Sequence, residues 1–324
     1  MYNKIGMSHM AQYLESLRPA QIRLVAAIAE HGQLQVAASS CKMTQPAASR
    51  MLAEIERNLA TALFTRSAKG MEPTNAGALL ARHATRINHD LTRMAEEFSD
   101  LRAGLGGTVR VGAVTGPALG HLVPAIQKLK STTKGVDISV EVAPSVALVQ
   151  GLERGDLDFA LARLPAHMNQ RDFHVEPARD EIVRLLVRDS HPMLAHAPVA
   201  IGALNHLPWI LQDRGAPIRH AIELAFNDEG MAAPEDITTT SSLLMIIALL
   251  KQSDAIAPLS QEVIDLMLHP PVCAEFRVLT LNRFVTVEPF MILRGRGRTL
   301  SRAAERLLEL TRASIAQFDP PKTV

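Results

Sequence analysis

The stretch Thr44-Gln45-Pro46-Ala47-Ala48-Ser49-Arg50-Met51-Leu52-Ala53-Glu54-Ile55-Glu56 decides how the first part of this 324-residue chain folds. Thr44 can accept a hydrogen bond from a free backbone N–H as a helix N-cap. Pro46 falls in the first turn, where its missing donor does no harm. The stretch therefore predicts a helix that begins directly after Thr44.

The two sides of this helix differ in chemistry. Four apolar residues recur at helical spacing and predict a side packed on a core: Ala48, Leu52, Ile55 and Leu59. Another side carries Gln45, Ser49 and Ala53 at steps of four, with Pro46 and Arg50 beside them. Glutamine can pair with adenine in a DNA major groove, and arginine can pair with guanine or a phosphate. The pattern is typical of a recognition helix, although an amphipathic helix with a solvated side fits this segment equally well.

Two shorter helices are expected before it. The first starts near Pro19 and can end at Gly32, and the second runs from Leu34 to about Ser40. Residues 41–43 then form a tight connection to the capped helix. A short helix, a turn and a helix with a polar outer side make a helix-turn-helix.

The segment after the capped helix predicts a wing. Residues 65–74 are polar around a central Lys69-Gly70, which is typical of a hairpin. This hairpin would place Arg66 and Lys69 where they can hold DNA phosphates.

A long helix should follow between Thr74, which can cap it, and the glycine joint at residues 104–107. Apolar residues recur along it at alternating steps of four and three: Leu80, Ala84, Ile87, Leu91, Met94, Phe98 and Leu101. Such a heptad seam predicts a partner helix. We therefore expect a homodimer that presents two recognition helices to two half-sites, with packing on the helix's own domain as the alternative.

Beyond Gly107, strands and helices alternate in a pattern that predicts two α/β lobes with open, parallel sheets. Ligands of such sheets bind at the carboxyl ends of the strands. Polar residues at the predicted strand ends could bind an anionic or hydroxyl-rich small molecule: Thr115, Ser145, Arg163, Gln212 and Thr240.

Composition narrows the class of protein. The chain is 47% hydrophobic and 21% charged, and no apolar run reaches the roughly 20 residues of a membrane span. Its start lacks a secretory signal, so we expect a cytoplasmic protein. Cys41 and Cys273 are far apart, which predicts neither a disulfide nor a zinc site. Net charge is +1, but residues 1–75 hold eight basic residues against five acidic ones, a bias that suits DNA binding.

No catalytic motif is recognisable. The sequence has no GxSxG, no HExxH, no phosphate-binding glycine loop and no dinucleotide fingerprint. Asp156 and Asp158 are more typical of capping than of acid–base catalysis. The tract Arg294-Gly295-Arg296-Gly297-Arg298 is similar to minor-groove-reading segments, but its place between a strand and a helix favours a solvated loop.

These residues together resemble a LysR-type transcriptional regulator over nearly the whole chain. The matching segments are Ala37-Ala38, residues 44–50, Ile55-Glu56, residues 63–66, residues 74–77, residues 155–160 and His191-Pro192. Gln33, Ala60 and Pro73 stand where the family usually has serine, glycine and leucine. Residues 31–33, 69–71 and 112–116 are similar to the family's galactose-binding-protein-regulator group, which implies a sugar or organic acid effector.

The resemblance implies an α+β multidomain chain without a cofactor or metal. Residues 17–74 would form a winged helix-turn-helix, 75–103 a dimerising linker helix, and 107–318 an effector domain of periplasmic-binding-protein type. Lobe I would comprise about 107–180 and 282–318, and lobe II about 181–281. The partners implied are double-stranded DNA, further copies of the chain in a dimer or tetramer, and a small-molecule inducer.

DNA contacts would come from Gln45, Pro46, Ser49 and Arg50, and from Arg66 at the wing. A solute-binding protein and an α/β enzyme are the alternatives. The missing export signal and the N-terminal module count against the first, and the missing catalytic motif counts against the second.

Overall fold

The computed structural model describes residues 10–67, 70–103 and 107–317. The chain folds into two compact units, of which the first comprises the residues up to 108 together with residues 150–157, and the second comprises the rest. Lys69 and the glycine joint at residues 104–106 lie outside the described residues.

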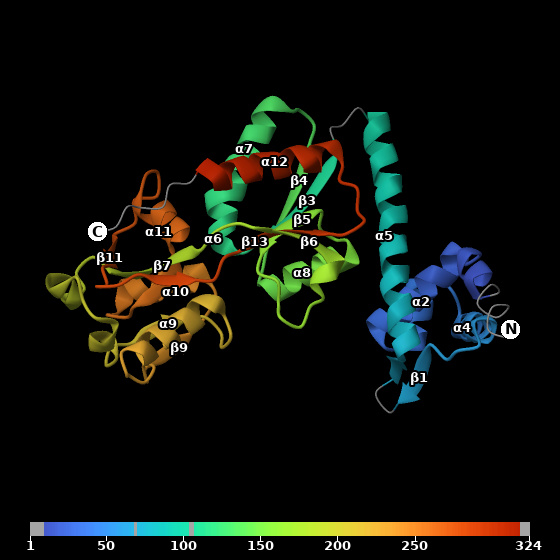
Figure 1. Ribbon diagram of the computed structural model, residues 1–324, viewed down its shortest axis with the longest axis horizontal. Coiled ribbons are helices and arrows are strands. Elements are labelled where there is room, and N and C mark those ends of the chain that lie inside the picture. The colour runs from blue at the N-terminus through green and yellow to red at the C-terminus, as the bar shows by residue number, and fades with distance from the viewer. Residues whose placement is uncertain (1–9, 68–69, 104–106, 318–324) are drawn as a thin grey trace. The chain divides into compact units, whose positions relative to one another are not determined.

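Three helices and a hairpin make the core of the first unit, and a long helix follows them (Figure 1). The elements are α2 (Pro19–His31), α3 (Leu34–Ser40), α4 (Gln45–Leu59), β1 (Phe64–Ser67), β2 (Gly70–Pro73) and α5 (Asn75–Ala103). The strands β1 and β2 pair antiparallel, with Phe64 opposite Pro73. The helix-turn-helix and wing predicted from the sequence are therefore present, and Pro73 does not disturb the register.

The start of α4 follows the predicted chemistry. The hydroxyl of Thr44 accepts from the Ala47 N–H at 3.4 Å, and Pro46 lies in the first turn. The side formed by Ala48, Leu52, Ile55 and Leu59 is buried in the core with residues of α2 and α3.

The beginning of α5 is fixed to the segment before the wing. The Thr74 hydroxyl donates to the Ala62 carbonyl at 2.8 Å and accepts from the Gly77 N–H at 3.0 Å. A Cβ atom on Gly77 would overlap the carbonyl oxygen of Leu63 and lie 2.8 Å from its carbonyl carbon. Only glycine fits here, so the first turn of α5 packs against backbone.

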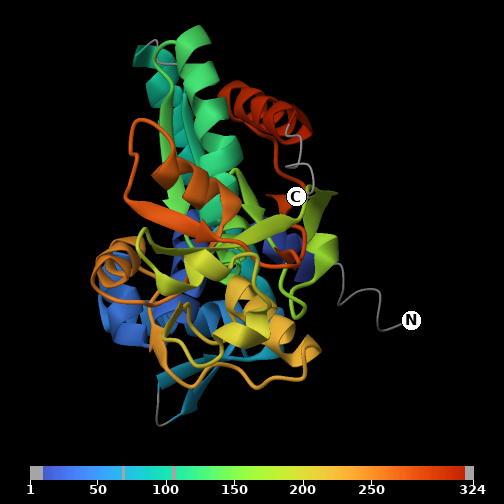
Figure 2. The ribbon, with the colours of Figure 1, turned by 90° about the vertical axis from the view of Figure 1, so that its left-hand side faces the viewer.

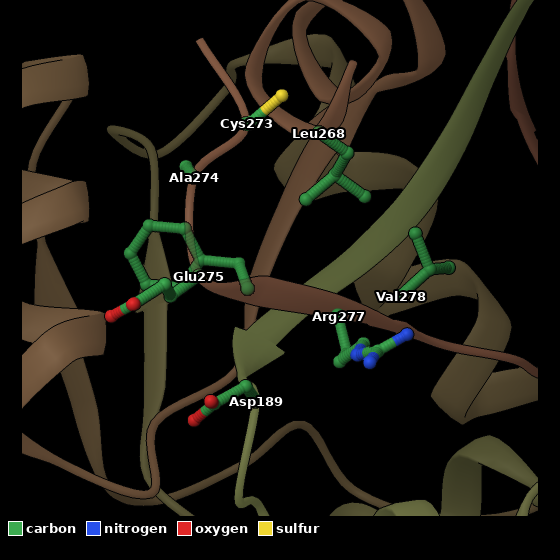
Figure 3. Close-up of a pocket in the computed structure, with 8 residues that line it drawn as sticks. Asp189, Leu268, Cys273, Ala274, Glu275, Arg277 and Val278 are labelled. Carbon is green, nitrogen blue, oxygen red and sulfur yellow. The ribbon is translucent and has the colours of Figure 1, made fainter. Parts of the chain in front are cut away.

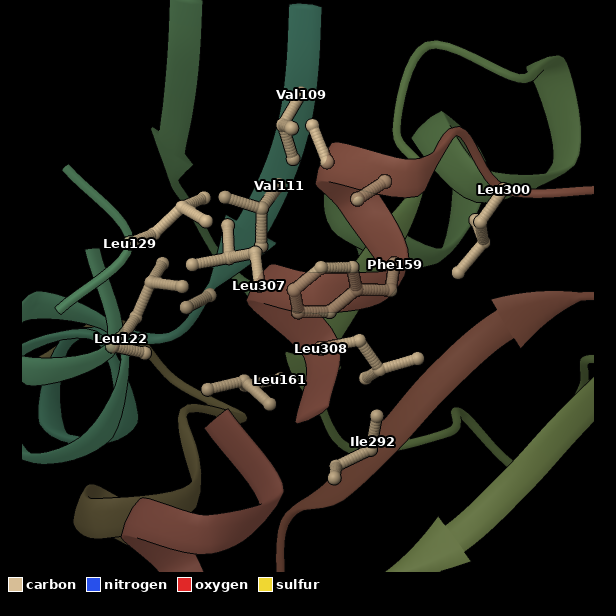
Figure 4. Packing of buried hydrophobic residues seen from close by; sticks show 14 of the residues in the cluster. Val109, Val111, Leu122, Leu129, Phe159, Leu161, Ile292, Leu300, Leu307 and Leu308 are labelled. Carbon is tan, nitrogen blue, oxygen red and sulfur yellow. The ribbon is translucent and has the colours of Figure 1, made fainter. Parts of the chain in front are cut away.

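Lobe I of the second unit is a five-stranded sheet in the order β4-β3-β5-β13-β6. Its elements are β3 (Thr108–Ala113), α6 (Thr115–Pro117), η1 (Ala118–Leu122), α7 (Val123–Thr132), β4 (Asp137–Val142), α8 (Ser145–Arg154), β5 (Phe159–Ala162), η2 (Gln170–Asp172), β6 (Phe173–Pro177), β13 (Met291–Gly295) and α12 (Arg302–Gln317). The helices α7 and α12 lie side by side (Figures 1 and 2). Side chains such as Val111, Phe159 and Leu307 fill the core between them and the sheet (Figure 4).

Lobe II lies between β6 and β13 in the sequence. Its elements are β7 (Glu181–Arg188), η3 (Pro192–His196), η4 (Ile201–Leu204), β8 (Trp209–Leu211), α9 (Pro217–Asp228), β9 (Ile237–Thr239), α10 (Leu243–Gln252), β10 (Ala257–Ser260), α11 (Gln261–Leu268), β11 (Phe276–Leu279) and β12 (Val285–Val287). The strand β7 is central and pairs with β10, β11 and β12.

The prediction of parallel sheets is only partly right. The pairs β3–β5 and β8–β9 are parallel, but every partner of β7 is antiparallel, and so are both partners of β13. The reason is that β7 and β13 are the strands at which the chain crosses between the lobes, so neither is followed by a helical return to a parallel neighbour. Alternating hydrophobicity does not reveal strand direction.

Candidate functional site

The predicted DNA-contacting residues of α4 lie on its solvent side. Gln45, Pro46 and Arg50 are exposed, and Ser49 is half-buried beside them. These residues come together because the opposite side of α4 is committed to the core. The first two turns of α4 thus present the amide of Gln45, the hydroxyl of Ser49 and the guanidinium of Arg50. This is the end of the second helix that a helix-turn-helix inserts into a groove.

The wing is fastened to α4 at its base. The carboxylate of Glu56 accepts from the N–H groups of Leu63 and Phe64, at 2.8 and 3.2 Å. The Met71 N–H donates to the carbonyl of Gly32 at 2.7 Å. Arg66 is exposed on β1, whereas Lys69 lies outside the described residues. Sequence reasoning missed the role of Glu56, because an acidic residue near a helix end looks like ordinary surface.

The predicted seam on α5 divides into two parts. Ala84 is buried against α2 in the core of the first unit, so the alternative of packing on the helix's own domain holds there. Further along, Ile87, Met94 and Phe98 are 43%, 52% and 64% exposed. An exposed apolar row of this kind on a helix is a surface that a partner would cover.

In lobe I the structure brings two predicted effector residues together. Ser145 begins α8 and Arg163 follows β5, and the Ser145 hydroxyl accepts from the Arg163 N–H at 3.0 Å. Thr115 begins α6 directly after β3. All three residues therefore lie at helix starts or strand ends, as the sequence predicts.

The guanidinium of Arg163 already has partners. It contacts the Glu181 carboxylate at 2.5 Å and donates to the Glu288 carbonyl at 2.8 Å, and both side chains of the ion pair are largely buried. Burial of a pair of opposite charges leaves a site that is electrically neutral overall. This partnership was not visible in the sequence.

A second ion pair lies near the junction of the lobes. Arg179 contacts Glu262 at 3.4 Å, and burial is the main reason why the pKa of Glu262 is raised. Gly116 packs so closely here that a Cβ atom on it would lie 2.8 Å from the Ser260 hydroxyl. The α6 segment of lobe I therefore contacts the start of α11 in lobe II through a residue with no side chain.

In lobe II an arginine organises the ends of two parallel strands. Arg219 is buried on α9 and donates to the carbonyl of Gln212 at 3.1 Å and to the hydroxyl of Thr239 at 3.5 Å. The Thr240 N–H donates to the Leu211 carbonyl at 2.9 Å. Gln212 and Thr240 thus follow the ends of adjacent strands. Among the described residues, no hydrogen bond or ion pair joins them to Thr115, Ser145 or Arg163.

A pocket of about 570 Å³ lies elsewhere in lobe II (Figure 3). It is lined by Asp189, Leu268, Cys273, Ala274, Glu275, Phe276, Arg277 and Val278. None of the predicted effector residues is among them. Residues of the edge strand β11 and of the segment before it form much of the pocket wall. No pattern in the sequence predicted this pocket.

The remaining sequence candidates have structural roles. The buried Asp158 carboxylate accepts from the Arg110 N–H of β3 at 2.8 Å. This bond fixes the start of β5 to β3, so Asp158 does not cap a helix as the sequence suggested. The prediction of a solvated loop at Arg294–Arg298 is wrong in part, because Arg294 belongs to β13 and the terminal nitrogens of Arg298 are buried. Buried apolar neighbours such as Leu300 draw this segment onto the lobe.

Neither metal ligation nor membrane insertion finds support in the described part of the chain. No cluster of three or more His, Cys, Asp or Glu side chains is placed to hold a metal ion there. None of the helices described is long and apolar enough to cross a bilayer. Cys41 and Cys273 are free thiols.

The chain combines a winged helix-turn-helix, a long helix and a two-lobed α/β domain, in that order. This is the architecture of a DNA-binding regulator with a ligand-binding domain. Models of known families match the same parts. The LysR substrate binding domain matches residues 102–316, and the bacterial regulatory helix-turn-helix of the lysR family matches residues 19–78.

Named relatives agree with these matches. The transcriptional regulator GbpR of Rhizobium radiobacter is 35% identical over 76% of this chain and 82% of its own length. The GbpR of Azospirillum brasilense is 32% identical over 92% of this chain and 86% of its own length. The chain therefore belongs to the LysR family of DNA-binding transcriptional regulators, not to a family of enzymes, and carries that family's effector-binding domain.

Solved structures show the same fold. A full-length OxyR variant from Pseudomonas aeruginosa superposes with a TM-score of 0.62 at 20% identity, covering 93% of this chain and 95% of that one. Full-length CbnR in complex with its target DNA superposes with a TM-score of 0.60 at 20% identity, covering 92% and 100%.

Proposed function

We propose that the exposed side of α4 enters the major groove of the operator and that the wing holds the DNA backbone. The residues proposed to contact DNA are Gln45, Pro46, Ser49, Arg50, Arg66 and Lys69. The observation that carries this proposal is the division of α4 into a buried apolar side and an exposed side with Gln45 and Arg50. Polar side chains that are excluded from the core are available to base edges.

Substitution of Arg50 tests this interface. The DNA probe is the duplex that the parent protein selects from a random-sequence pool. Arg50→Ala should weaken binding to this duplex by about 1–3 kcal/mol for each half-site and relax the preference for one base. Arg23→Ala is the matched control, since Arg23 is also exposed but lies on α2. Unchanged footprints with the Arg50 variant would show that α4 does not read the DNA.

We also propose that two copies of the chain pair through α5, as a homodimer that can assemble further into a tetramer. The exposed row of Ile87, Met94 and Phe98 supports this. A dimer would bury the row and would supply two copies of α4 for two half-sites.

A charge in the row should separate the subunits. Met94→Glu is expected to lower the mass measured by light scattering or sedimentation. Leu79→Glu is a matched control, because Leu79 and Met94 are both 52% exposed but Leu79 lies outside the heptad row. Equal masses for both variants and the parent protein would exclude α5 as the dimer contact.

The effector proposed for the second unit is a hydroxyl-rich small molecule, such as a sugar or an organic acid, bound between the lobes. Thr115, Ser145, Gln212 and Thr240 offer neutral hydrogen-bonding groups. Arg163 is already neutralised by Glu181. A neutral set of donors and acceptors favours hydroxyl groups over a densely charged anion. The setting in which we expect this regulation is the cytoplasm, where the protein would bind the nucleoid.

A panel of sugars and sugar acids tests this proposal on the full-length protein by calorimetry. Ser145→Ala should lower the affinity for the ligand that the parent protein binds. Ser131→Ala, which changes an exposed serine on α7, should leave this affinity unchanged. Equal affinity for the parent and Ser145→Ala proteins would place the effector elsewhere, and the pocket beside β11 would then be the next candidate.

A further inference from the structure

Three helices of the first unit end in a residue with left-handed backbone. The residues are Gly32 after α2, Lys42 after α3 and Ala60 after α4, with φ angles of 63°, 55° and 49°. Glycine is favoured at such positions because a Cβ atom crowds the following carbonyl there. Lys42 and Ala60 therefore adopt this backbone conformation at a cost in free energy that Gly32 does not have.

Backbone hydrogen bonds impose this conformation on Lys42. Its N–H donates to the Ser39 carbonyl at 3.0 Å, and the Met43 N–H donates to the Ala38 carbonyl at 2.9 Å. This pair of bonds is the Schellman motif, and Met43 packs against the core beside it. The turn of the helix-turn-helix thus requires the left-handed residue, and the side chain of Lys42 is not what shapes it.

The Lys42 side chain is free to act on something outside the protein. It is exposed, and its ammonium group has no hydrogen-bond or ion-pair partner among the residues that the structure describes. Lys42 lies two residues before the N-cap Thr44, at the end of α4 that carries Gln45 and Arg50.

We propose that Lys42 is a phosphate-binding residue, which holds the DNA backbone at the edge of the groove that α4 enters. This inference rests on the proposed placement of α4. Ala60 shares the left-handed backbone, so what distinguishes Lys42 is its exposed cation, which is unpaired among the described residues and which the local fold does not need. The turn is where the chain passes from a helix that crosses the backbone to a helix in the groove, so a cation there lies next to phosphates.

A stabilising role is the competing explanation for Lys42. A cation at the carboxyl end of α3 interacts favourably with the helix dipole. The two roles predict opposite results when lysine is replaced by glycine. If Lys42 contacts a phosphate, Lys42→Gly should raise folding stability and weaken DNA binding. If Lys42 only interacts with the dipole of α3, Lys42→Gly should lower folding stability and leave DNA binding unchanged.

The test compares Lys42→Gly, Lys42→Arg and Ala60→Gly in the full-length protein. The probe is the DNA duplex that the parent protein selects from a random-sequence pool, titrated between about 50 and 200 mM salt. Ala60→Gly is the matched control, since Ala60 sits in the same motif after α4: its N–H donates to the Arg57 carbonyl and the Thr61 N–H to the Glu56 carbonyl.

Lys42→Gly should raise the thermal midpoint of the first unit and weaken DNA binding. The slope of log affinity against log salt should fall by about 0.9 per subunit, which over this salt range is a factor of about 3.5. Lys42→Arg should keep the parent slope. Ala60→Gly should raise the midpoint and leave the slope unchanged.

A parent-like slope for Lys42→Gly, or an equal change of slope for Ala60→Gly, would overturn the inference. Arg50→Ala, measured alongside, separates the placement of α4 from the phosphate contact of Lys42. If that variant binds normally while Lys42→Gly lowers the slope, the placement of α4 fails and the phosphate contact stands. If Arg50→Ala weakens binding while Lys42→Gly changes nothing, Lys42 alone is excluded.

Discussion

A buried histidine should make the second unit sensitive to acid. His121 lies in the π-helical turn between α6 and α7, fully buried in lobe I. Its ring stacks on Phe290 with centroids 5.7 Å apart, and its Nδ1 atom is 3.4 Å from the Ser314 hydroxyl. Burial, followed by the positive charge of Arg179, lowers the pKa of His121 from 6.5 to about 4.

The sign and size of the effect follow from linkage. Below pH 6.5 the unfolded chain takes up a proton on this imidazole, while the folded protein excludes it until about pH 4. Stability is therefore lost as the pH falls through this range. Each pKa unit corresponds to about 1.4 kcal/mol, so the full loss is roughly 3 kcal/mol.

His121→Leu should remove this pH dependence. We expect the difference in unfolding free energy between the parent protein and the variant to shift by roughly 2–3 kcal/mol between about pH 7 and pH 4.5. Urea titrations followed by the fluorescence of Trp209, the one tryptophan of the chain, and by circular dichroism measure it. His220→Leu, at an exposed histidine, is the control. A constant difference between parent and His121→Leu across this range would refute the reasoning.

Three further substitutions test individual contacts of the fold. Glu56→Ala deprives two backbone N–H groups of their acceptor and should cost about 2–4 kcal/mol, with faster hydrogen exchange at Leu63; unchanged exchange would contradict the role of Glu56. Gly77→Ala should lower the thermal midpoint of the first unit, by about 1–3 kcal/mol or more in stability, because its Cβ would overlap the Leu63 carbonyl; an unchanged midpoint would contradict this. Two hydrogen bonds from Arg312, at 2.6 and 2.8 Å, are the main reason why the pKa of Glu176 is lowered from 4.5. The parent protein should therefore exceed Arg312→Gln in urea midpoint at neutral pH and lose this advantage below pH 4.5 as Glu176 takes up a proton.

Local chemistry explains which elements the sequence revealed. The cap at Thr44, the proline after it and the spacing of Ala48, Leu52 and Ile55 are all contained in one segment, so α4 could be predicted from residues alone. The wing was equally accessible through its turn residues. At the early part of the heptad row the alternative of packing on the helix's own domain holds, because α2, which precedes the wing in sequence, buries Ala84.

Long-range partners explain what the sequence could not reveal. Arg163 and Glu181 are 18 residues apart, and Arg179 and Glu262 are 83 apart. No spacing rule connects such pairs, since only the fold brings them together. The neutral character of the predicted effector site was therefore invisible beforehand, and the proposed DNA contacts and lobe boundaries stay predictions.

The anchoring of the wing has a consequence for the DNA. Glu56 ties β1 to α4, and Met71 ties β2 to the end of α2, so the separation between Arg50 and Arg66 is set by the interior of the protein. In the DNA complex proposed above, a DNA-binding unit with this fixed spacing would transfer any misfit in groove width to the duplex. Operators with easily deformed pyrimidine–purine steps at positions outside the base contacts would then bind better, although no side chain touches those steps.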